Sequence, residues 1–199
     1  GDRPGYSVSL SSDGSIVAIG AINNNTGKGH VRVYKYRQYT QSDYDDETYH
    51  YTSQTQNTGS QQKPLIITEN YAVPGINKSY WMQLGADIDG KVNYDYSGYS
   101  VSLSSDGTIV AIGAIQQYGS GLRHGYVSVY ERNTSNTTTD PIGWTQLGAD
   151  IVGQVSGDFS GYSVSLSSDG TIVAIGAYGN DGNGSTSGHV RVYQYDATK

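Results

Sequence analysis

An acidic cluster is the least repetitive chemistry in the sequence. It reads Asp43-Tyr44-Asp45-Asp46-Glu47, with His50 close behind. Carboxylates at this density bind a hard cation weakly, but the surrounding stretch is polar and poor in aliphatic residues, which favours a solvated loop. A second stretch, Asn180–Gly184, has the composition of a calcium loop and lacks the closing acid. The sequence therefore predicts no metal site and no cofactor.

Nucleophilic catalysis needs a serine held at a strained turn beside a base. The serines here alternate along repeated segments, and the nearest approach to a Gly-x-Ser-x-Gly elbow, Gly184–Gly188, has Thr186 at its centre. His30 and His189 fall at one repeat position and are interpreted as strand-entry residues. His124 lies in a loop and is kept as a candidate partner contact. Because the aspartates recur in every repeat, whereas a catalytic pair usually breaks the symmetry, we predict that the protein is not an enzyme.

Asparagines of the Asn-x-Ser/Thr type form another group of candidate sites. All of them fall in predicted loops, where a glycan is tolerated, and two lie in the short loop of the second repeat. They favour an extracellular or cell-surface glycoprotein. The five candidates are Asn24, Asn77, Asn133, Asn136 and Asn183, with Asn133 and Asn136 the best placed.

Tyrosines outside the predicted strands are candidate partner contacts. Tyr39, Tyr44, Tyr49 and Tyr51 lie in a polar insertion at residues 37–80. Tyrosine is favoured at interfaces because it combines a large apolar area with a hydroxyl. We hypothesise that the insertion contacts a partner or a neighbouring copy. A single strand is predicted within it, at Leu65–Thr68.

Composition narrows the class of protein. The 199 residues include 27 glycines and 19 tyrosines but one Met, one Phe and no Cys, and the formal net charge is −6. These numbers describe a turn-rich all-β chain without disulfides or thiolate metal sites. An acidic chain with scattered basic residues disfavours nucleic acid as a partner. No apolar run reaches the length of a membrane span, so membrane insertion is not expected.

A seventeen-residue unit organises the chain. Gly98–Ala114, GYSVSLSSDGTIVAIGA, recurs letter for letter at Gly161–Ala177 and with one change at Gly5–Ala21. Tyrosine, valine and leucine alternate with serine, which predicts a strand, and Ser-Asp-Gly then supplies a hairpin turn. The β-branched run Ile109–Ile112 predicts a second strand covered on both faces. One such hairpin is marginal alone, so each copy must pack against its neighbours.

Two further segments complete each repeat. The third strand is predicted at His30–Tyr36, Tyr126–Tyr130 and His189–Tyr195, and the fourth at Trp81–Ile88 and Trp144–Ile151. The whole chain, 1–199, is then a single array. Repeat one covers residues 1–92 with the insertion at 37–80, repeat two covers 93–155, and repeat three covers 156–199 and lacks its fourth strand. The fold class is all-β, with four-stranded antiparallel meanders repeated three times as β-propeller blades.

The hairpin and the following Gly-His-Val-Arg-Val-Tyr resemble the FG-GAP repeats of β-propellers, the family that includes the integrin α-subunit head. The resemblance implies four-stranded blades with the Gly5 strand innermost and the Trp81 strand outermost. Blades of the integrin type carry a calcium loop with several acidic residues. Here Asp13, Asp106 and Asp169 stand alone in their loops, so we interpret them as turn residues.

Three visible blades are fewer than the four to eight that typically close a propeller, so the array is a partial or assembly-completed one. The sequence therefore favours a non-catalytic structural or adhesion protein of a surface filament, sheath or particle, with other copies or sister repeats as partners. The alternative is a discrete propeller that binds an extracellular protein or glycan.

Overall fold

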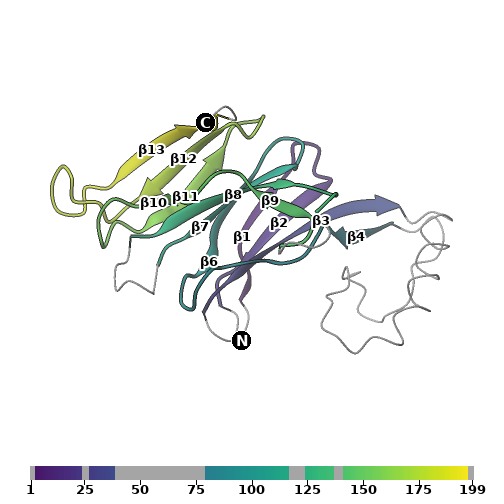
Figure 1. The fold of residues 1–199 in the computed structure, drawn as a ribbon, viewed down its shortest axis with the longest axis horizontal. Coiled ribbons are helices and arrows are strands. Elements are labelled where there is room, and N and C mark those ends of the chain that lie inside the picture. The colour runs from purple at the N-terminus through teal and green to yellow at the C-terminus, as the bar shows by residue number, and fades with distance from the viewer. Residues whose placement is uncertain (1–2, 24–26, 39–78, 117–123, 137–140, 197–199) are drawn as a thin grey trace.

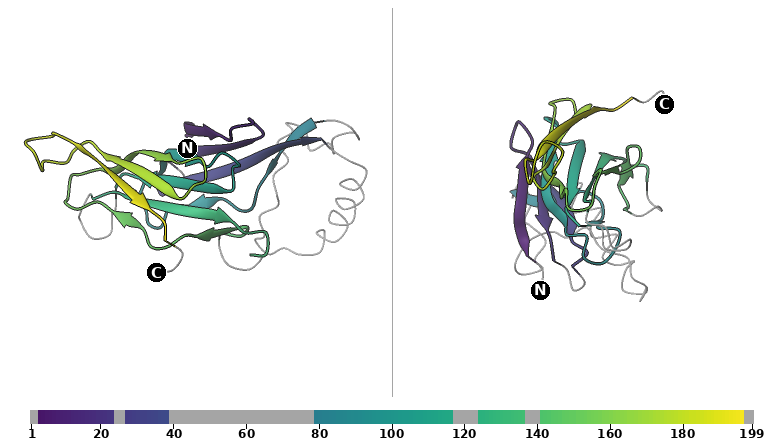
Figure 2. Two further views of the ribbon diagram at one scale, coloured as in Figure 1. Left: turned by 90° about the horizontal axis from the view of Figure 1, so that it is seen from above. Right: turned by 90° about the vertical axis from the view of Figure 1, so that its left-hand side faces the viewer.

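The computed structural model describes residues 3–23, 27–38, 79–116, 124–136 and 141–196. Every regular element among these residues is a strand, and the strands form three antiparallel sheets. Figures 1 and 2 show the sheets following one another in chain order, with the first and third at the two ends of the row. The predicted all-β, propeller-blade-like fold is confirmed. The strand predicted at Leu65–Thr68 lies outside the described residues.

The first sheet, blade one, follows the predicted meander. Its order is β1-β2-β3, and two short strands, β4 and β5, both pair with the outer edge of β3. The strands are β1 (Pro4–Leu10), β2 (Ile16–Ala21), β3 (His30–Gln38), β4 (Ser79–Gln83) and β5 (Ile88–Asp89).

Blades two and three repeat this plan. Blade two has the order β6-β7-β8 with β9 and β10 on the outer edge of β8, whereas blade three has only β11-β12-β13 among the described residues. Blade two comprises β6 (Ser97–Leu103), β7 (Ile109–Ala114), β8 (Tyr126–Arg132), β9 (Trp144–Gln146) and β10 (Ile151–Val152); blade three comprises β11 (Ser160–Leu166), β12 (Ile172–Ala177) and β13 (His189–Gln194).

The prediction of one continuous fourth strand was wrong. Within Trp81–Ile88 the strand stops at Gln83 and restarts at Ile88. Gly85 between them has a φ of 73°, which leaves the extended region and turns the backbone out of the ladder. The break turns Asp87 toward β3, where its carboxylate meets Arg32. Gly148 has a φ of 69° in the equivalent gap of blade two, so the interruption is part of the repeat.

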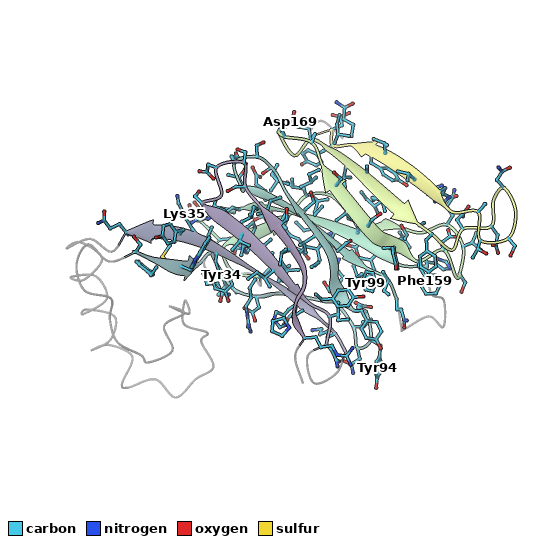
Figure 3. All side chains as sticks on the ribbon, turned by 180° about the vertical axis from the view of Figure 1, so that it is seen from behind. Tyr34, Lys35, Tyr94, Tyr99, Phe159 and Asp169 are labelled. Atoms are coloured by element: carbon cyan, nitrogen blue, oxygen red, sulfur yellow. The ribbon has the colours of Figure 1, made fainter. Side chains whose placement is uncertain are left out.

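The hairpin turns are built as predicted. The carboxylate of Asp106 accepts hydrogen bonds from the Ser104 hydroxyl and from the backbone N–H of Thr108. Gly107 follows with a φ of 70°. The hydrogen bond from the backbone N–H of Thr108 is the main cause that lowers the pKa of Asp106, and the bond from the Ser104 hydroxyl lowers this pKa further. Asp13 and Asp169 make the same contacts in the other two hairpins. Asp169 marks one such turn in Figure 3, with Tyr99 and Phe159 toward the opposite ends of the strands.

The core lies in two layers, one between each pair of neighbouring blades. The described part of the chain contains no helix that is long and apolar enough to cross a bilayer.

Candidate functional site: the blade contacts and the two end faces

An apolar layer joins blade one to blade two. Val31 and Val33 of blade one are fully buried against Val101, Leu103 and other apolar residues of blade two. A second layer joins blade two to blade three, in which Val127 packs with Val173 and Ile175. Each blade therefore presents one face to the blade before it and the other to the blade after it.

Serines connect the inner strands of successive blades. The hydroxyl of Ser7 donates to the carbonyl of Gly98 at 2.7 Å, and Ser100 donates to Gly161 at the same distance. The backbone N–H of Leu103 donates to the hydroxyl oxygen of Ser9. Ser102 accepts from Leu166 in the same manner. We call these contacts the serine zipper. Because they bind backbone groups, they fix the register of one blade on the next.

Glycines allow the blades to approach this closely. A Cβ on Gly20 would overlap the carbonyl oxygen of Gly98 in the next blade, and a Cβ on Gly113 would overlap that of Gly161. Only a glycine admits such contact between backbones. Gly176 holds the same position in blade three, and the three heavy atoms nearest to a Cβ placed there all belong to Ser163 of its own blade. The space that a following blade fills elsewhere is open there.

The N-terminal end face consists of Tyr6, Val8 and Leu10 on β1. Val8 is 62% exposed and Leu10 is 60% exposed. Their equivalents in blade two, Val101 and Leu103, are 8% and 7% exposed because blade one covers them. The N-terminal end face thus has the residue types of an internal blade contact and no cover among the described residues.

The C-terminal end face consists of Ile172, Val190 and Val192 on β12 and β13. Val190 is 68% exposed, whereas its equivalents Val31 and Val127 are fully buried. The serines of blade three that correspond to the zipper serines, Ser163 and Ser165, are also exposed. Exposed apolar patches of this kind on a folded chain mark interaction surfaces.

Pro4 makes the N-terminal end face chemically different from the internal contacts. The N–H of Ser97 donates to the carbonyl of Lys28 in the preceding blade, and Ser160 donates to His124 in the same way. Pro4 stands at this position in blade one and has no N–H. A blade that docks on the N-terminal end face therefore forgoes one hydrogen bond.

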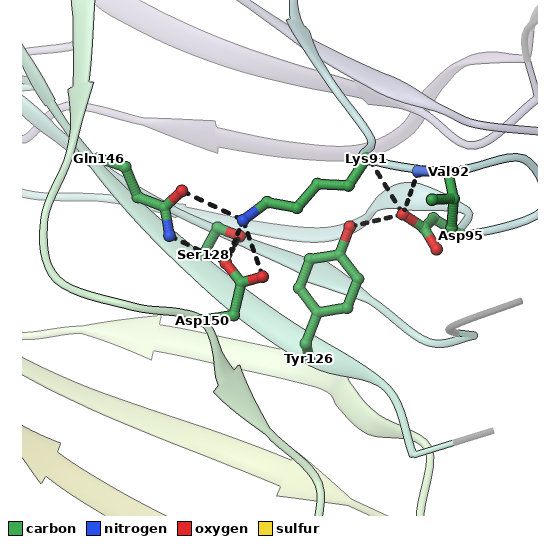
Figure 4. A network of polar contacts seen from close by, with 7 residues as sticks. All are labelled: Lys91, Val92, Asp95, Tyr126, Ser128, Gln146 and Asp150. Carbon is green, nitrogen blue, oxygen red and sulfur yellow. Dashed lines mark hydrogen bonds and ion pairs between the residues drawn. The ribbon is translucent and has the colours of Figure 1, made fainter. Parts of the chain in front are cut away.

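A polar network lies beside the contact of blades one and two (Figure 4). Lys91, in the linker between them, reaches both carboxylate oxygens of Asp150 at 2.6 and 2.7 Å and the side chain of Gln146 at 3.2 Å. Ser128 and Gln146 also donate to Asp150. The Lys91 side chain is 43% exposed, so the ion pair adds little to stability and serves chiefly to orient the linker.

Asp95 anchors the same linker from a fully buried position. One carboxylate oxygen accepts from the N–H groups of Lys91 and Val92 and from the Tyr126 hydroxyl. The other oxygen has no hydrogen-bond partner among the described residues. Burial raises the pKa of Asp95, and burial together with the bond to Asp95 raises the pKa of Tyr126. In the next linker Asp158 has both oxygens bonded, because Asn180 supplies the second donor.

Blade one uses a different cation on its own outer aspartate. The Arg32 guanidinium binds both oxygens of Asp87 at 2.8 to 2.9 Å, and Gln83 donates to the same carboxylate. Burial would raise the pKa of Asp87, but the hydrogen bonds from Arg32 and Gln83 outweigh it and the pKa is lowered. Each of these two blades thus holds its interrupted outer strand by one cation on one aspartate.

A row of tyrosines crosses the three inner strands. The ring centroids of Tyr6 and Tyr99 lie 4.8 Å apart, those of Tyr99 and Tyr162 5.0 Å, and those of Tyr162 and Tyr178 4.5 Å. Burial and the two flanking phenols raise the pKa of Tyr99. Tyr6, Tyr162 and Tyr178 are each more than two-fifths exposed, so the row presents an aromatic surface at the end of the strands opposite the hairpin turns.

Most predicted contact residues lie outside the described residues: the four insertion tyrosines Tyr39, Tyr44, Tyr49 and Tyr51, the acidic cluster, and the sequons at Asn24 and Asn77. His124 lies at the contact of blades two and three, where its backbone carbonyl accepts a hydrogen bond from the N–H of Ser160. The amide of Asn136 donates to the carbonyls of Pro141 and Trp144, and that of Asn133 donates to Thr145. Asn183 is exposed.

Sequence reasoning placed the apolar layers but left the serine zipper unassigned. The sequence shows only that the serines alternate along each repeat, and the structure shows that Ser7, Ser9, Ser100 and Ser102 bond to the neighbouring blade. Their identical spacing in all three repeats was the available signal. In the part of the chain that is described, no three acidic or histidine side chains gather as a metal site requires.

Comparison with known proteins agrees with the repeat architecture. Residues 153–193 match the family model of the FG-GAP repeat, a span that includes β11, β12 and β13. No curated protein matches the chain. The third repeat is therefore of the FG-GAP type, and its hairpin sequence occurs unchanged in the second.

Proposed function

We propose that this chain is a non-catalytic structural or adhesion module that works by docking blade onto blade with other copies of itself or with sister repeats. The observation that carries the proposal is the state of the two end faces. They expose residues whose equivalents are buried at the first internal contact and buried or partly buried at the second, and they are complementary to each other because the contacts follow the same repeat.

Several features support a structural role. The repeated serines bind the backbone of the adjacent blade, which gives them a positioning task that needs no nucleophilic chemistry. FG-GAP repeats are typical of extracellular or surface proteins, and the sequons are compatible with an assembled glycoprotein outside the cell. We therefore place the module in a surface filament, sheath or particle.

The size of the purified chain tests this proposal. Sedimentation velocity over a hundredfold range of concentration, with electron microscopy of the same samples, is expected to show linear oligomers that lengthen with concentration. Leu10→Ser and Val192→Ser, one on each end face, should each shorten them, while Val92→Ser, an exposed linker residue away from both faces, should not. A chain that stays monomeric throughout, or oligomers unaffected by both end-face changes, would contradict the proposal.

The tyrosine row favours a second function, that of a binding module. Aromatic rings in a row offer flat apolar area with hydroxyls at the rim, which suits a glycan or a protein loop. Replacing Tyr99 by Leu removes both the flat ring and the hydroxyl and leaves an apolar side chain in its place. If binding is the function, this change weakens retention on a glycan array or a cell surface while the oligomer distribution stays the same.

A further inference from the structure

The outer edge of β13 has no pairing strand in the described part of the chain. In blades one and two the third strand carries β4 and β5, or β9 and β10, on this edge. No described strand pairs with it in blade three. An open edge of backbone N–H and C=O groups is a template for another strand.

The side chains on β13 repeat those that hold the outer strand in blade one. Arg191 stands where Arg32 binds Asp87, and Tyr195 stands where Tyr36 contacts the Trp81 ring at 5.3 Å between centroids. Arg191 donates to the Tyr193 hydroxyl at 3.1 Å instead of to a carboxylate. Tyr195 is 45% exposed.

The position of the cation distinguishes blade three from blade two. Blade two has Ser128 at the Arg32 position, and its cation, Lys91, comes from the preceding linker. Blade three has the reverse arrangement. Its third strand carries Arg191 where blade two has Ser128, and its preceding linker carries the neutral Gln154 where blade two has Lys91. Blade three therefore carries its cation, Arg191, on the third strand, at the position that Arg32 holds in blade one.

We propose that the β13 edge binds an extended segment of another protein chain with the pattern Trp-x-Gln-Leu-Gly-Ala-Asp-Ile. The segment adds to the sheet as an antiparallel strand, in the register by which Gln83 faces Tyr34 and Ile88 faces Val31. Its glutamine then faces Tyr193, its tryptophan lies on Tyr195, and its aspartate accepts the Arg191 guanidinium. This inference rests on the proposed assembly through blades and names the strand that the partner supplies.

A peptide in trans tests it. The probe is a fluorescein-labelled peptide of residues 144–152, WTQLGADIV, added to the full 199-residue chain and followed by fluorescence anisotropy. Saturable binding is expected. Replacing the peptide aspartate by asparagine should weaken it about tenfold, because the charge-assisted bidentate contact is lost.

The chain variant Arg191→Ser, which installs the residue of blade two, should weaken binding of the original peptide by a similar factor. With this variant the asparagine peptide should bind no worse than the aspartate peptide. Arg191→Lys keeps the charge and should recover part of the affinity. No binding, or binding that survives Arg191→Ser because the peptide displaces β9 and β10 of blade two, would overturn the inference.

Leu10→Ser separates this inference from the proposed function. It alters the N-terminal end face, so it should shorten oligomers and leave peptide binding unchanged. Oligomers without peptide binding would reject the edge site alone, whereas peptide binding by a chain that never associates would reject the assembly and keep the edge site.

Discussion

The strands β1 and β6 carry the same sequence from glycine to leucine, GYSVSL, and differ in what covers them. Leu103 on β6 is 7% exposed because blade one lies against it, whereas Leu10 on β1 is 60% exposed. The pairing registers with β2 and β7 are equivalent. Local structure therefore follows from the repeat itself, while burial depends on the presence of a preceding blade.

This difference separates two kinds of stabilisation. The hairpin turn around Asp106 is made within five residues and is the same in every blade. The apolar layers and the serine zipper exist only where two blades meet. Changes to the first kind should act alike wherever they are made, and changes to the second kind should depend on position.

The largest expected difference comes from truncating the two leucines. Leu103→Ala leaves a cavity between blades one and two and should lower the free energy of unfolding by about 2 to 5 kcal/mol. Leu10→Ala should change it by no more than about 0.5 kcal/mol at concentrations where the chain is monomeric. Urea unfolding followed by tryptophan fluorescence measures both. Equal losses would show that the two strands are covered alike.

Gly113 and Gly176 form a second matched pair. A methyl group on Gly113 meets the Gly161 carbonyl of the next blade, so Gly113→Ala should destabilise the chain by about 1 to 3 kcal/mol. The nearest atom to a methyl group on Gly176 is the hydroxyl of Ser163, a side chain that can move, so Gly176→Ala should cost clearly less. For association between copies the expected order is reversed: Gly176→Ala should weaken association more than Gly113→Ala does, because the added methyl group blocks the docking of a further blade. Chemical unfolding and sedimentation of the same two variants provide the comparison.

Pro4 offers a way to strengthen the end contact. Pro4→Ser supplies the N–H that Ser97 and Ser160 use at the internal contacts. One added hydrogen bond contributes about 0.5 to 1.5 kcal/mol, so the dissociation constant between copies should fall up to about tenfold. The same substitution should barely alter the unfolding of the monomer. An unchanged dissociation constant would mean that the N-terminal end face does not meet a blade in the internal register.

The smallest effects belong to the hairpin turns. Hydrogen bonds from the Ser11 hydroxyl and from the N–H and hydroxyl of Ser15 lower the pKa of Asp13 to about 2, from an ordinary 3.8. The folded chain then binds fewer protons than the unfolded chain between these values. The contribution of Asp13 to stability is therefore complete above pH 3.8 and is lost as the pH falls toward 2.

Asp13→Asn should consequently make the acid-induced fall in stability shallower in that window. Asp106→Asn should do the same in the middle blade, since the pKa of Asp106 is lowered by equivalent bonds. Thermal unfolding between pH 5 and pH 2 measures both variants. A strong dependence on which blade carries the change would contradict the local character of the turn.

Much of the fold was predictable because the same strand and turn pattern occurs three times in the sequence. Alternation along Gly98–Leu103 and the Ser-Asp-Gly turn have direct physical meanings, so strands and hairpins followed from short windows. The interruption at Gly85 was missed because a single glycine inside an apolar run is compatible with a strand or a break. Only the pairing partner, Arg32 for Asp87, decides between them, and that contact spans 55 residues.

The candidate site was less accessible from the sequence. Arg32 binds Asp87 in blade one and Lys91 binds Asp150 in blade two, so two equivalent aspartates receive their cation from two unrelated positions. The sequence around Arg32 or around Lys91 does not by itself show which aspartate the cation binds. Likewise, the identical spacing of the serines marks them as part of the repeat, but only the arrangement of the blades shows that they bond to the neighbouring blade and not to water.

Disulfide trapping between copies tests the central claim most directly, because the chain has no cysteine of its own. Ser9 and Leu103 meet at the first internal contact, so a head-to-tail contact between copies brings Ser165 of one to Leu10 of the next. A mixture of Ser165→Cys and Leu10→Cys chains should form a covalent heterodimer under mild oxidation, well above either variant alone. The double variant Ser9→Cys with Leu103→Cys should close within one chain as the positive control. A closed control with no heterodimer in the mixture would show that the end faces do not dock in this way.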